Sequence, residues 1–140
     1  KSIMRGVATP AWSMAQGSVT GSDSTFKRYP FDPEKAKKLL AEAGYPNGFE
    51  VGFDCPNDRY VNDERICQAV TAMWDKIGIK AKLLAQPKAT YFPKMLGDKS
   101  SVYLLGWAPA TVDGKNVLVA MCLLTAAAAS SWLRSAKNCA

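Results

Sequence analysis

Histidine is absent from the 140-residue sequence. Its absence removes the usual general base of enzymes, the commonest zinc ligand and any Ser-His-Asp triad. Closely spaced cysteine pairs are absent too, since the four cysteines form no Cys-x-x-Cys motif, so no zinc site is expected. No glycine-rich phosphate loop follows an expected strand. The sequence therefore predicts neither a metal nor a cofactor.

Arginine-rich blocks and long hydrophobic runs are also missing. The net charge is +6 and the pI about 9.2, but the lysines are scattered over residues 35–38, 80–82 and 94–99. This distribution is typical of a solvated basic surface, and we predict no nucleic-acid partner. The apolar stretch at 116–129 is too short and too weakly hydrophobic to cross a membrane.

The composition that is present is that of an ordinary globular domain. Hydrophobic residues make up 48% and charged residues 21% of the chain, and the length allows one domain with a modest core. The opening residues 1–5 carry no start methionine and no signal-peptide pattern, so we expect a fragment of a longer protein. Residues 1–30 are rich in Gly, Ser, Thr and Pro, which predicts an extended segment with little regular structure.

The clearest local pattern is an amphipathic helix over residues 32–43. Asp32 is the expected N-cap, and Pro33 occupies the first helical position, where a missing N–H does no harm. Gly44 is expected to end the helix in the left-handed conformation. The apolar face follows the i, i+3, i+4, i+7 spacing and consists of Ala36, Leu39, Leu40 and Ala43.

Helices and strands then alternate along the chain. Strands are predicted over residues 50–55, 79–85 and 102–107, with helices over 63–77 and 90–96 between them. Strands joined by helices imply a parallel sheet with right-handed crossovers. We therefore predict an α/β fold, a three-layer lobe with a mainly parallel sheet.

Local signals refine these elements. Asn62 is the expected cap of the helix over 63–77, and Thr90 a possible cap of the next helix, which would place Pro93 in a tolerated first turn. The continuous apolar run from Val102 to Trp107 predicts a strand buried on both faces.

Four segments of the sequence resemble a known family. In order, they read RYPFDPEKAKKLLAEAGYPNGFEV, DCPNDRYVNDERICQAV, IGIKAKLLAQPKATYFPKM and YLLGWAPAT, and they span residues 28–111. Residues 4–21 are similar to the segment just upstream. The order and spacing resemble the periplasmic dipeptide- and oligopeptide-binding proteins, the extracellular solute-binding proteins of ABC importers.

The resemblance implies a role and a domain organisation. It implies one lobe of a type II periplasmic binding protein, which captures peptides or similar solutes between two lobes and delivers them to an ABC permease, in the periplasm or outside the cell. After Thr111 the family usually continues with an acidic Asp-Pro turn, which is lacking here. We assign residues 1–113 to part of one lobe and 114–140 to an unmatched tail, helical and packed on the lobe. A single lobe is expected not to bind alone as the two-lobed family does.

Candidate ligand residues follow the predicted strands, because ligands of open α/β sheets bind beyond the carboxyl ends of the strands. Asn57, Asp58 and Arg59 follow the first strand, and Arg59 offers a fork for a carboxylate. The alternative is that Asp58 and Arg59 pair with each other and fix the loop. Gly106 and Trp107 end the third strand, where Trp107 either lines the cleft or belongs to the core.

The cysteines are interpreted through the compartment that the resemblance implies. A disulfide between Cys55 and Cys67 would clamp the loop at the edge of the cleft, and the alternative is two buried free thiols. Cys122 and Cys139 lie in the unmatched tail, and no prediction is made for them.

Two other functional classes are weighed against solute binding. The carboxylates of Asp54, Asp58, Asp63 and Glu64 are close in sequence and suggest an acid/base pair, but the last two are explained as first-turn helix residues, so we predict no enzyme. The second class is a stand-alone α/β interaction module that forms a homodimer through the former inter-lobe surface.

Overall fold

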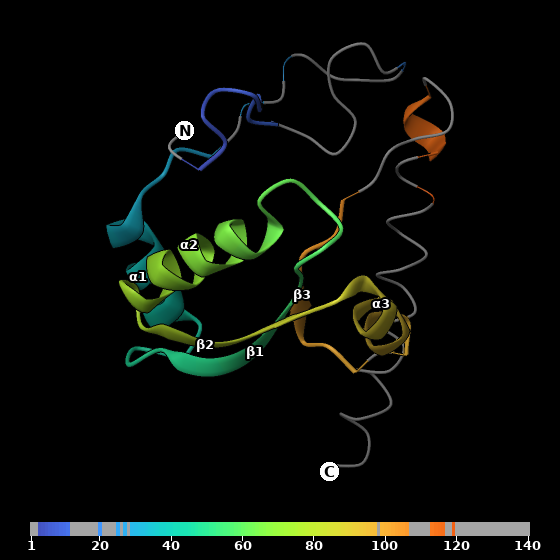
Figure 1. Cartoon of the computed structure of the whole chain (residues 1–140). Helices are drawn as coiled ribbons and strands as arrows, with labels where there is room; N and C mark the ends of the chain where they lie inside the picture. The colour runs from blue at the N-terminus through green and yellow to red at the C-terminus, as the bar shows by residue number, and fades with distance from the viewer. Residues whose placement is uncertain are drawn as a thin grey trace. The chain divides into compact units, whose positions relative to one another are not determined.

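The computed structural model describes residues 3–11, 20, 25, 27, 29–97, 99–106, 113–116 and 119. The chain divides into two compact units. The first comprises Lys1–Ala8 and Pro30–Leu105, and the second Thr9–Tyr29 and Gly106–Ala140. All three named helices and all three named strands belong to the first unit (Figure 1).

The first unit is organised around a three-stranded parallel sheet. Its strands are β1 (Phe49–Pro56), β2 (Ile79–Gln86) and β3 (Val102–Tyr103), in the order β2-β1-β3. β1 and β2 pair over their full length, from Phe49 opposite Ile79 to Pro56 opposite Gln86. Both strands therefore end at the same edge of the sheet. The prediction of a mainly parallel sheet is confirmed.

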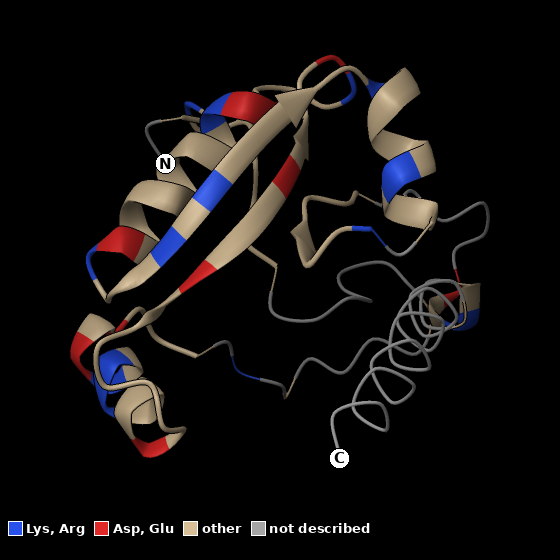
Figure 2. Cartoon of the chain, turned by 90° about the horizontal axis from the view of Figure 1, so that it is seen from below, with Lys and Arg blue, Asp and Glu red and all other residues tan. Residues whose placement is uncertain are grey.

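Helices lie on both faces of this sheet. α2 (Asp63–Asp75) runs along one face, as Figures 1 and 2 show from two sides. α3 (Lys88–Leu96) packs against the carboxyl half of β1, where Lys94 reaches Asp54. Because neighbouring side chains of a strand point to opposite faces, Asp54 faces α3 while Phe53 and Cys55 face α2. The predicted three-layer α/β arrangement is thus confirmed.

The core lies between α2 and the sheet. Its buried members are Phe53, Cys55 and Cys67. Partly buried apolar side chains complete it: Val70, Trp74, Ala81, Leu83, Val102 and Leu104. The tilted contact of the Phe53 and Trp74 rings, with centroids 5.2 Å apart, joins β1 to α2. This core holds the carboxyl end of β1 in place.

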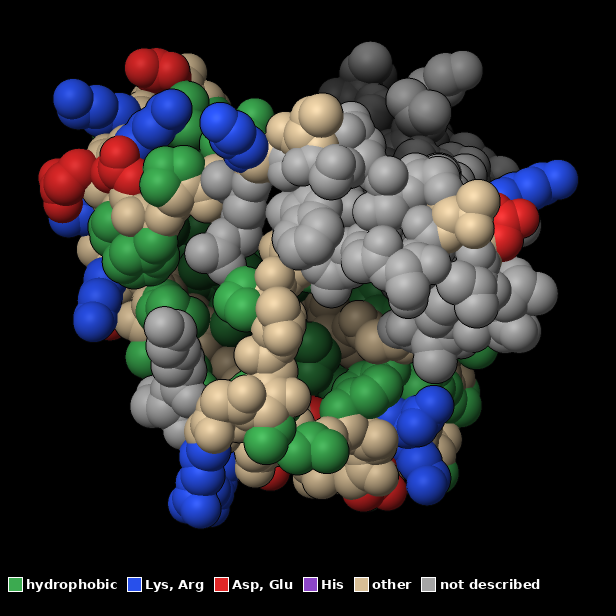
Figure 3. Space-filling view, turned by 90° about the horizontal axis from the view of Figure 1, so that it is seen from above, with side chains coloured by type: hydrophobic (Ala, Val, Ile, Leu, Met, Phe, Trp, Pro, Cys, Tyr) green, Lys and Arg blue, Asp and Glu red, His purple; other side chains and the backbone are tan. Residues whose placement is uncertain are grey.

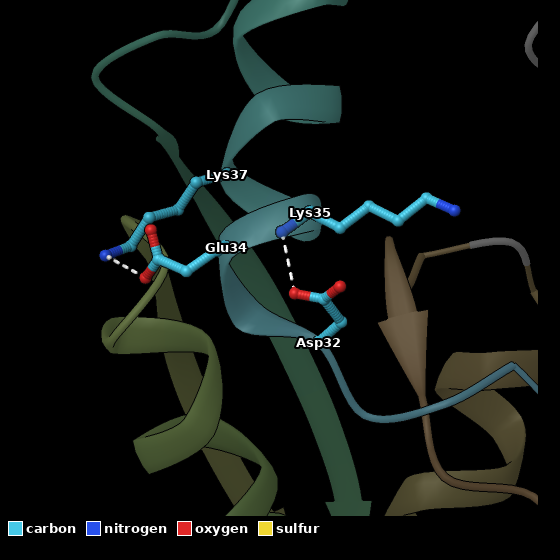
Figure 4. A network of polar contacts seen from close by, with 4 residues as sticks. All are labelled: Asp32, Glu34, Lys35 and Lys37. Carbon is cyan, nitrogen blue, oxygen red and sulfur yellow. Dashed lines mark hydrogen bonds and ion pairs between the residues drawn. The ribbon is translucent and has the colours of Figure 1, made fainter.

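α1 (Pro33–Glu42) begins as its sequence predicts. The Asp32 carboxylate accepts a hydrogen bond of 2.9 Å from the Lys35 N–H, and Lys37 pairs with Glu34 on the solvent side at 3.4 Å (Figure 4). Gly44 follows the helix with a φ of +90°, as expected for a left-handed terminator. The helix buries none of its residues fully, so its ends are defined mainly by these local signals.

Two glycines allow the turns before β1 and β2 to lie against each other. Gly48 has a φ of +74° and Gly78 a φ of +93°. A Cβ atom on Gly48 would overlap the carbonyl group of Gly78. These turns precede the first paired residues, Phe49 and Ile79, so the close approach sets the start of the β1–β2 pairing.

Several predicted details of the helix ends differ from the structure. α3 begins at Lys88 rather than at residue 90, Thr90 is not its cap, and Pro93 lies inside the helix rather than in its first turn. Asn62 is the N-cap residue of α2, as predicted, but it has a left-handed φ of +58° and its side chain makes no capping hydrogen bond. α2 itself ends at Asp75 rather than at residue 77.

β3 also differs from its prediction. Only Val102 and Tyr103 pair with β1, and both are half-buried rather than buried on two faces. The reason is position, since β3 lies at the edge of the sheet that the described residues form and has one neighbouring strand in it. A run of apolar residues predicts burial but does not tell an edge strand from a central one.

The second unit shows one small piece of pairing among its described residues. Thr20 and Asp113 form an isolated parallel bridge, and the Gly114 N–H donates to the Thr20 carbonyl at 2.9 Å. No helix in the described part of the chain is long and apolar enough to cross a membrane. The domain boundary predicted at residue 113 and the packing of residues 114–140 remain predictions.

Candidate functional site

The candidate site lies at the edge where β1 and β2 end. The loop over residues 57–62, called the β1–α2 loop here, follows β1 directly and leads into α2. The Asn57 N–H donates to the Gln86 carbonyl at 3.1 Å, which fastens the start of this loop to the end of β2. The fold thus brings the loops after β1 and β2 together, as expected for a parallel sheet.

Asp58 points from this loop to α3. Its carboxylate accepts a 2.7 Å hydrogen bond from the N–H of Lys88, the first residue of α3. The N-cap position of α3 is held by Pro87, whose side chain cannot cap. Asp58 therefore caps α3 from thirty residues away in sequence. This contact gives Asp58 a structural role, although with a different partner from the Arg59 that the sequence suggested.

Arg59 is exposed and carries its charge over an aromatic ring. Its guanidinium carbon lies 5.2 Å from the centre of the Tyr60 ring, a cation–π distance. Among the described residues no ion pair joins Arg59 to Asp58 or to another carboxylate. The planar donor fork of Arg59 thus stays accessible at the end of β1.

Asp63, the first residue of α2, organises the loop that precedes it. One carboxylate oxygen accepts hydrogen bonds of 3.0 Å from the N–H groups of Arg59 and Tyr60, and the other accepts one of 2.9 Å from Glu64. Burial alone would raise the pKa of Asp63, but these backbone N–H groups outweigh it and hold the pKa below its usual value. Asp63 is therefore kept ionised under the loop.

A disulfide closes the base of the same loop. Cys55 at the end of β1 and Cys67 in α2 are bonded, with Cα atoms 6.5 Å apart. Both residues are fully buried. The bridge encloses the whole β1–α2 loop within one short covalent ring, which restricts how far the loop can move away from the sheet.

The opposite side of β1 carries a second polar cluster. The buried Asp54 pairs with Lys94 of α3 at 2.5 Å, and the Tyr91 hydroxyl donates to the Leu104 carbonyl at 2.5 Å. Burial, and then nearby Tyr60, Tyr103 and Asp54, raise the pKa of Tyr91 far above its usual value. These contacts fix α3 against β1 and β3.

The four carboxylates considered as an acid/base group have separate partners. Asp54 pairs with Lys94, Asp58 accepts from Lys88, and Asp63 accepts from the loop. Glu64 accepts a 3.2 Å hydrogen bond from the Gln68 side chain. Within the described residues, no group of three metal-ligating side chains comes together.

Described residues of the first unit line two hollows that differ in character. A polar hollow of about 450 Å³ lies beside the β1–α2 loop. Its lining consists of Asn57, Tyr60, Asn62, Asp63, Glu64, Arg65 and Gln68. An apolar hollow of about 390 Å³ lies between the start of α1 and the end of α2, where Phe31 and Met73 are exposed. Hydrophobic side chains reach the surface in several places in the space-filling view of Figure 3.

The other two candidate residues, Gly106 and Trp107, do not belong to the unit that holds this loop. Gly106 is exposed and belongs to the second unit. Trp107 lies outside the described residues, so the choice between a cleft and a core position for its ring is open. Asn57, Asp58 and Arg59 are therefore the candidate ligand residues that the structure places together.

Comparison with protein families gives a clear result. Residues 1–128 match the model of the bacterial extracellular solute-binding proteins, family 5, middle part. The chain belongs to this family. The match extends beyond Thr111, where the recognisable motifs end, and so includes the first half of the segment 114–140. The fold is accordingly that of part of one lobe of a type II periplasmic binding protein.

Individual proteins are similar to this chain over most of its length. Heme-binding protein A of Haemophilus influenzae is 32% identical over 121 residues, which is 84% of this chain and 22% of that protein. The periplasmic binding protein DppA of Helicobacter pylori, solved with the peptide STSA, matches with a TM-score of 0.68 at 28% identity, over 74% of this chain and 20% of its own.

A further similar structure was solved with a different kind of solute. AgaA from A. tumefacien R10, in complex with agropinic acid, matches with a TM-score of 0.73 at 29% identity, over 83% of this chain and 25% of its own. The present chain thus spans about a fifth to a quarter of the length of these relatives.

Sequence reasoning missed Asp63 as a loop organiser. It interpreted Asp63 only as an acidic first-turn residue that stabilises the helix dipole, which it also is. The useful signal was the polar loop that precedes it, because the N–H groups of an irregular loop need acceptors. An acidic residue at the junction of such a loop and a helix can supply them.

Proposed function

We propose that this chain is part of the solute-binding component of an ABC importer, and that its β1–α2 loop contacts a peptide or a similar solute. The observation that carries the proposal is the exposed guanidinium of Arg59 at the carboxyl end of β1, free of carboxylate partners among the described residues. Solutes of the solved relatives include a peptide and an organic acid, and both carry carboxylates. A planar donor fork suits such a group.

The proposed role is capture and delivery, not catalysis. The relatives are solute-binding proteins, and one is described as a periplasmic protein associated with an ABC transporter. We accordingly propose a periplasmic or extracellular location and an ABC permease as the partner of the whole protein. Since tight binding by two-lobed proteins depends on closure of both lobes, we expect this chain alone to bind weakly.

Ligand-observed saturation-transfer NMR tests the role of Arg59. The probes are the tetrapeptide STSA and the same peptide with an amidated C-terminus. We expect the free acid to bind in the millimolar range and Arg59→Gln to weaken it at least about tenfold, because charge-assisted hydrogen bonds are lost. Lys80→Gln, which removes a charge from the other end of β2, is the matched control. Equal binding by the wild type and Arg59→Gln, or equal binding of acid and amide, would contradict the role of Arg59.

A second proposal is a stand-alone interaction module that self-associates. It is favoured by the apolar hollow between α1 and α2, whose rim includes Phe31 at 79% and Met73 at 43% exposure. Exposed apolar surface of this kind is covered in many proteins by a second copy. Sedimentation velocity over a range of concentrations separates the two proposals. A dimer that Phe31→Ser dissociates supports the module, and a monomer that responds to peptide supports transport.

A further inference from the structure

The β1–α2 loop is held to the rest of the first unit at several points along its length. It has no regular structure, yet its start is fastened to Gln86, its base is closed by the Cys55–Cys67 disulfide, and Asp58 ties it to α3. In its middle, the backbone N–H groups of Arg59 and Tyr60 both donate to the side chain of Asp63.

We propose that Asp63 is the positioning residue of this loop, and that its carboxylate holds the backbone of Arg59 and Tyr60 so that the guanidinium stays ready for a ligand. The proposal rests on the proposed function, because it gives the ordered loop a purpose in solute binding. Asp63 touches no ligand itself and acts through Arg59.

The geometry carries this inference. The two oxygens of the carboxylate are divided between two structures, one facing the loop amides at 3.0 Å and the other facing the Glu64 N–H in the first turn of α2 at 2.9 Å. The loop is therefore locked to the start of a helix whose far side is packed in the core. An asparagine here would offer one oxygen and one NH2 group, so one of the two sets of N–H groups would face a donor, and the remaining hydrogen bonds would lose the charge that strengthens them.

The backbone around Asp63 supports the same arrangement. Asn62 adopts the left-handed conformation, which turns the chain sharply just before Asp63, and its side chain donates to the Ile3 carbonyl at 3.2 Å. Asn62 is thus occupied elsewhere and leaves the capping task to Asp63. Orientation of Arg59 also depends on Tyr60, whose ring lies under the guanidinium. Because both backbone N–H groups donate to one oxygen of Asp63, the backbones of Arg59 and Tyr60 keep a fixed relative position.

Amide hydrogen exchange measured by NMR on the full 140-residue chain tests the proposal. In Asp63→Asn we expect the Arg59 and Tyr60 amides to exchange at least about tenfold faster, while the amides of β1 and β2 change less than twofold. The matched control is Glu64→Gln, which removes the same charge one residue later from a side chain that contacts Gln68. The proposal is overturned if the two loop amides keep their protection in Asp63→Asn, or lose it only together with the strands.

A pH titration of the wild type decides the matter should Asp63→Asn fail to fold. The Arg59 and Tyr60 amide shifts should follow the protonation of Asp63, with a midpoint below the ordinary aspartate value of about 3.9. The charged side chains that line the hollow with Asp63 are Glu64 and Arg65 of α2. Arg59 does not line the hollow, but its backbone N–H donates to Asp63. Amide shifts that stay flat, or that follow an ordinary carboxylate, would contradict the proposal.

The same samples separate this proposal from the proposed function. Adding the tetrapeptide STSA to the wild type and to Asp63→Asn should shift the Arg59 amide in the wild type and at least about fivefold less in the variant at equal peptide concentration. If the wild type fails to respond while Asp63→Asn loosens the loop, Asp63 still positions the loop and the solute-binding proposal fails. If both proteins respond equally, the positioning role is wrong and solute binding stands.

Discussion

Asp54 is a charged residue in the middle of a buried strand, with 5% of its side chain exposed. Such a residue costs several kcal/mol unless it is paired and hydrogen-bonded. Here the ammonium group of Lys94, from α3, pairs with the Asp54 carboxylate, and about one-third of the Lys94 side chain is exposed. The pair therefore fixes α3 to β1 at one point.

Replacing Lys94 tests the importance of this pair. Lys94→Met should destabilise the protein by about 3 kcal/mol, because it leaves Asp54 buried without its partner. Lys82→Met, which breaks the exposed pair of Lys82 with Glu50, should cause little change. Urea denaturation followed by circular dichroism measures both. Equal effects of the two substitutions would show that the buried pair does not hold α3.

A second residue-scale prediction concerns the close approach of two turns. Gly48→Ala should destabilise by about 3 kcal/mol or more, because the new methyl group overlaps the Gly78 carbonyl and the φ of +74° is unfavourable for alanine. Gly44→Ala has a similar φ of +90° but open space around it, so it should cost only about 1–2 kcal/mol. Thermal denaturation of both variants compares them. A Gly48→Ala protein as stable as Gly44→Ala would rule out the close approach.

At the scale of elements, the helices differ in how far residues close in sequence determine where each helix begins and ends. α1 was predicted well because its cap, its first-turn proline and its terminal glycine are neighbours in sequence. The start of α3 was predicted two residues late because its cap comes from Asp58, which no local pattern reveals. The length and the burial of β3 were overestimated, because the apolar character of a segment does not reveal how many strands lie beside it.

The cap of α3 gives an element-scale prediction. Asp58→Ala should destabilise the protein by about 1 kcal/mol and selectively increase amide exchange in the first turn of α3, since Lys88 loses its acceptor. Asp58→Asn keeps an acceptor oxygen and should retain most of the stability. Hydrogen exchange by NMR on the two variants checks this. Unchanged protection of the first turn in Asp58→Ala would contradict the capping role.

At the scale of the whole molecule, the position of the candidate site followed from topology, and its internal order did not. Parallel strands end at a common edge, so loops after β1 and β2 had to meet, and Asn57, Asp58 and Arg59 were predicted there. The partners within the loop depend on which backbone N–H groups face inward, which the sequence does not state. Asp63 was for that reason recognised only in the structure.

The segment 114–140 provides a test of the molecule as a whole. Its sequence is apolar over residues 116–129, and such residues need burial. Removing residues 114–140 should therefore lower both the melting temperature and the solubility of the chain. Differential scanning fluorimetry and a solubility assay of the shortened protein measure the effect. Unchanged values for both would show that this segment does not stabilise the fold.

An amide NMR titration of the 140-residue chain with the tetrapeptide STSA tests solute binding at the β1–α2 loop most directly. We predict saturable shifts concentrated in residues 57–62, with Arg59 among the largest, and none with the amidated peptide. No shifts in a folded protein, or shifts spread evenly over α1, α2 and the sheet, would contradict the claim that the β1–α2 loop forms part of a solute-binding site.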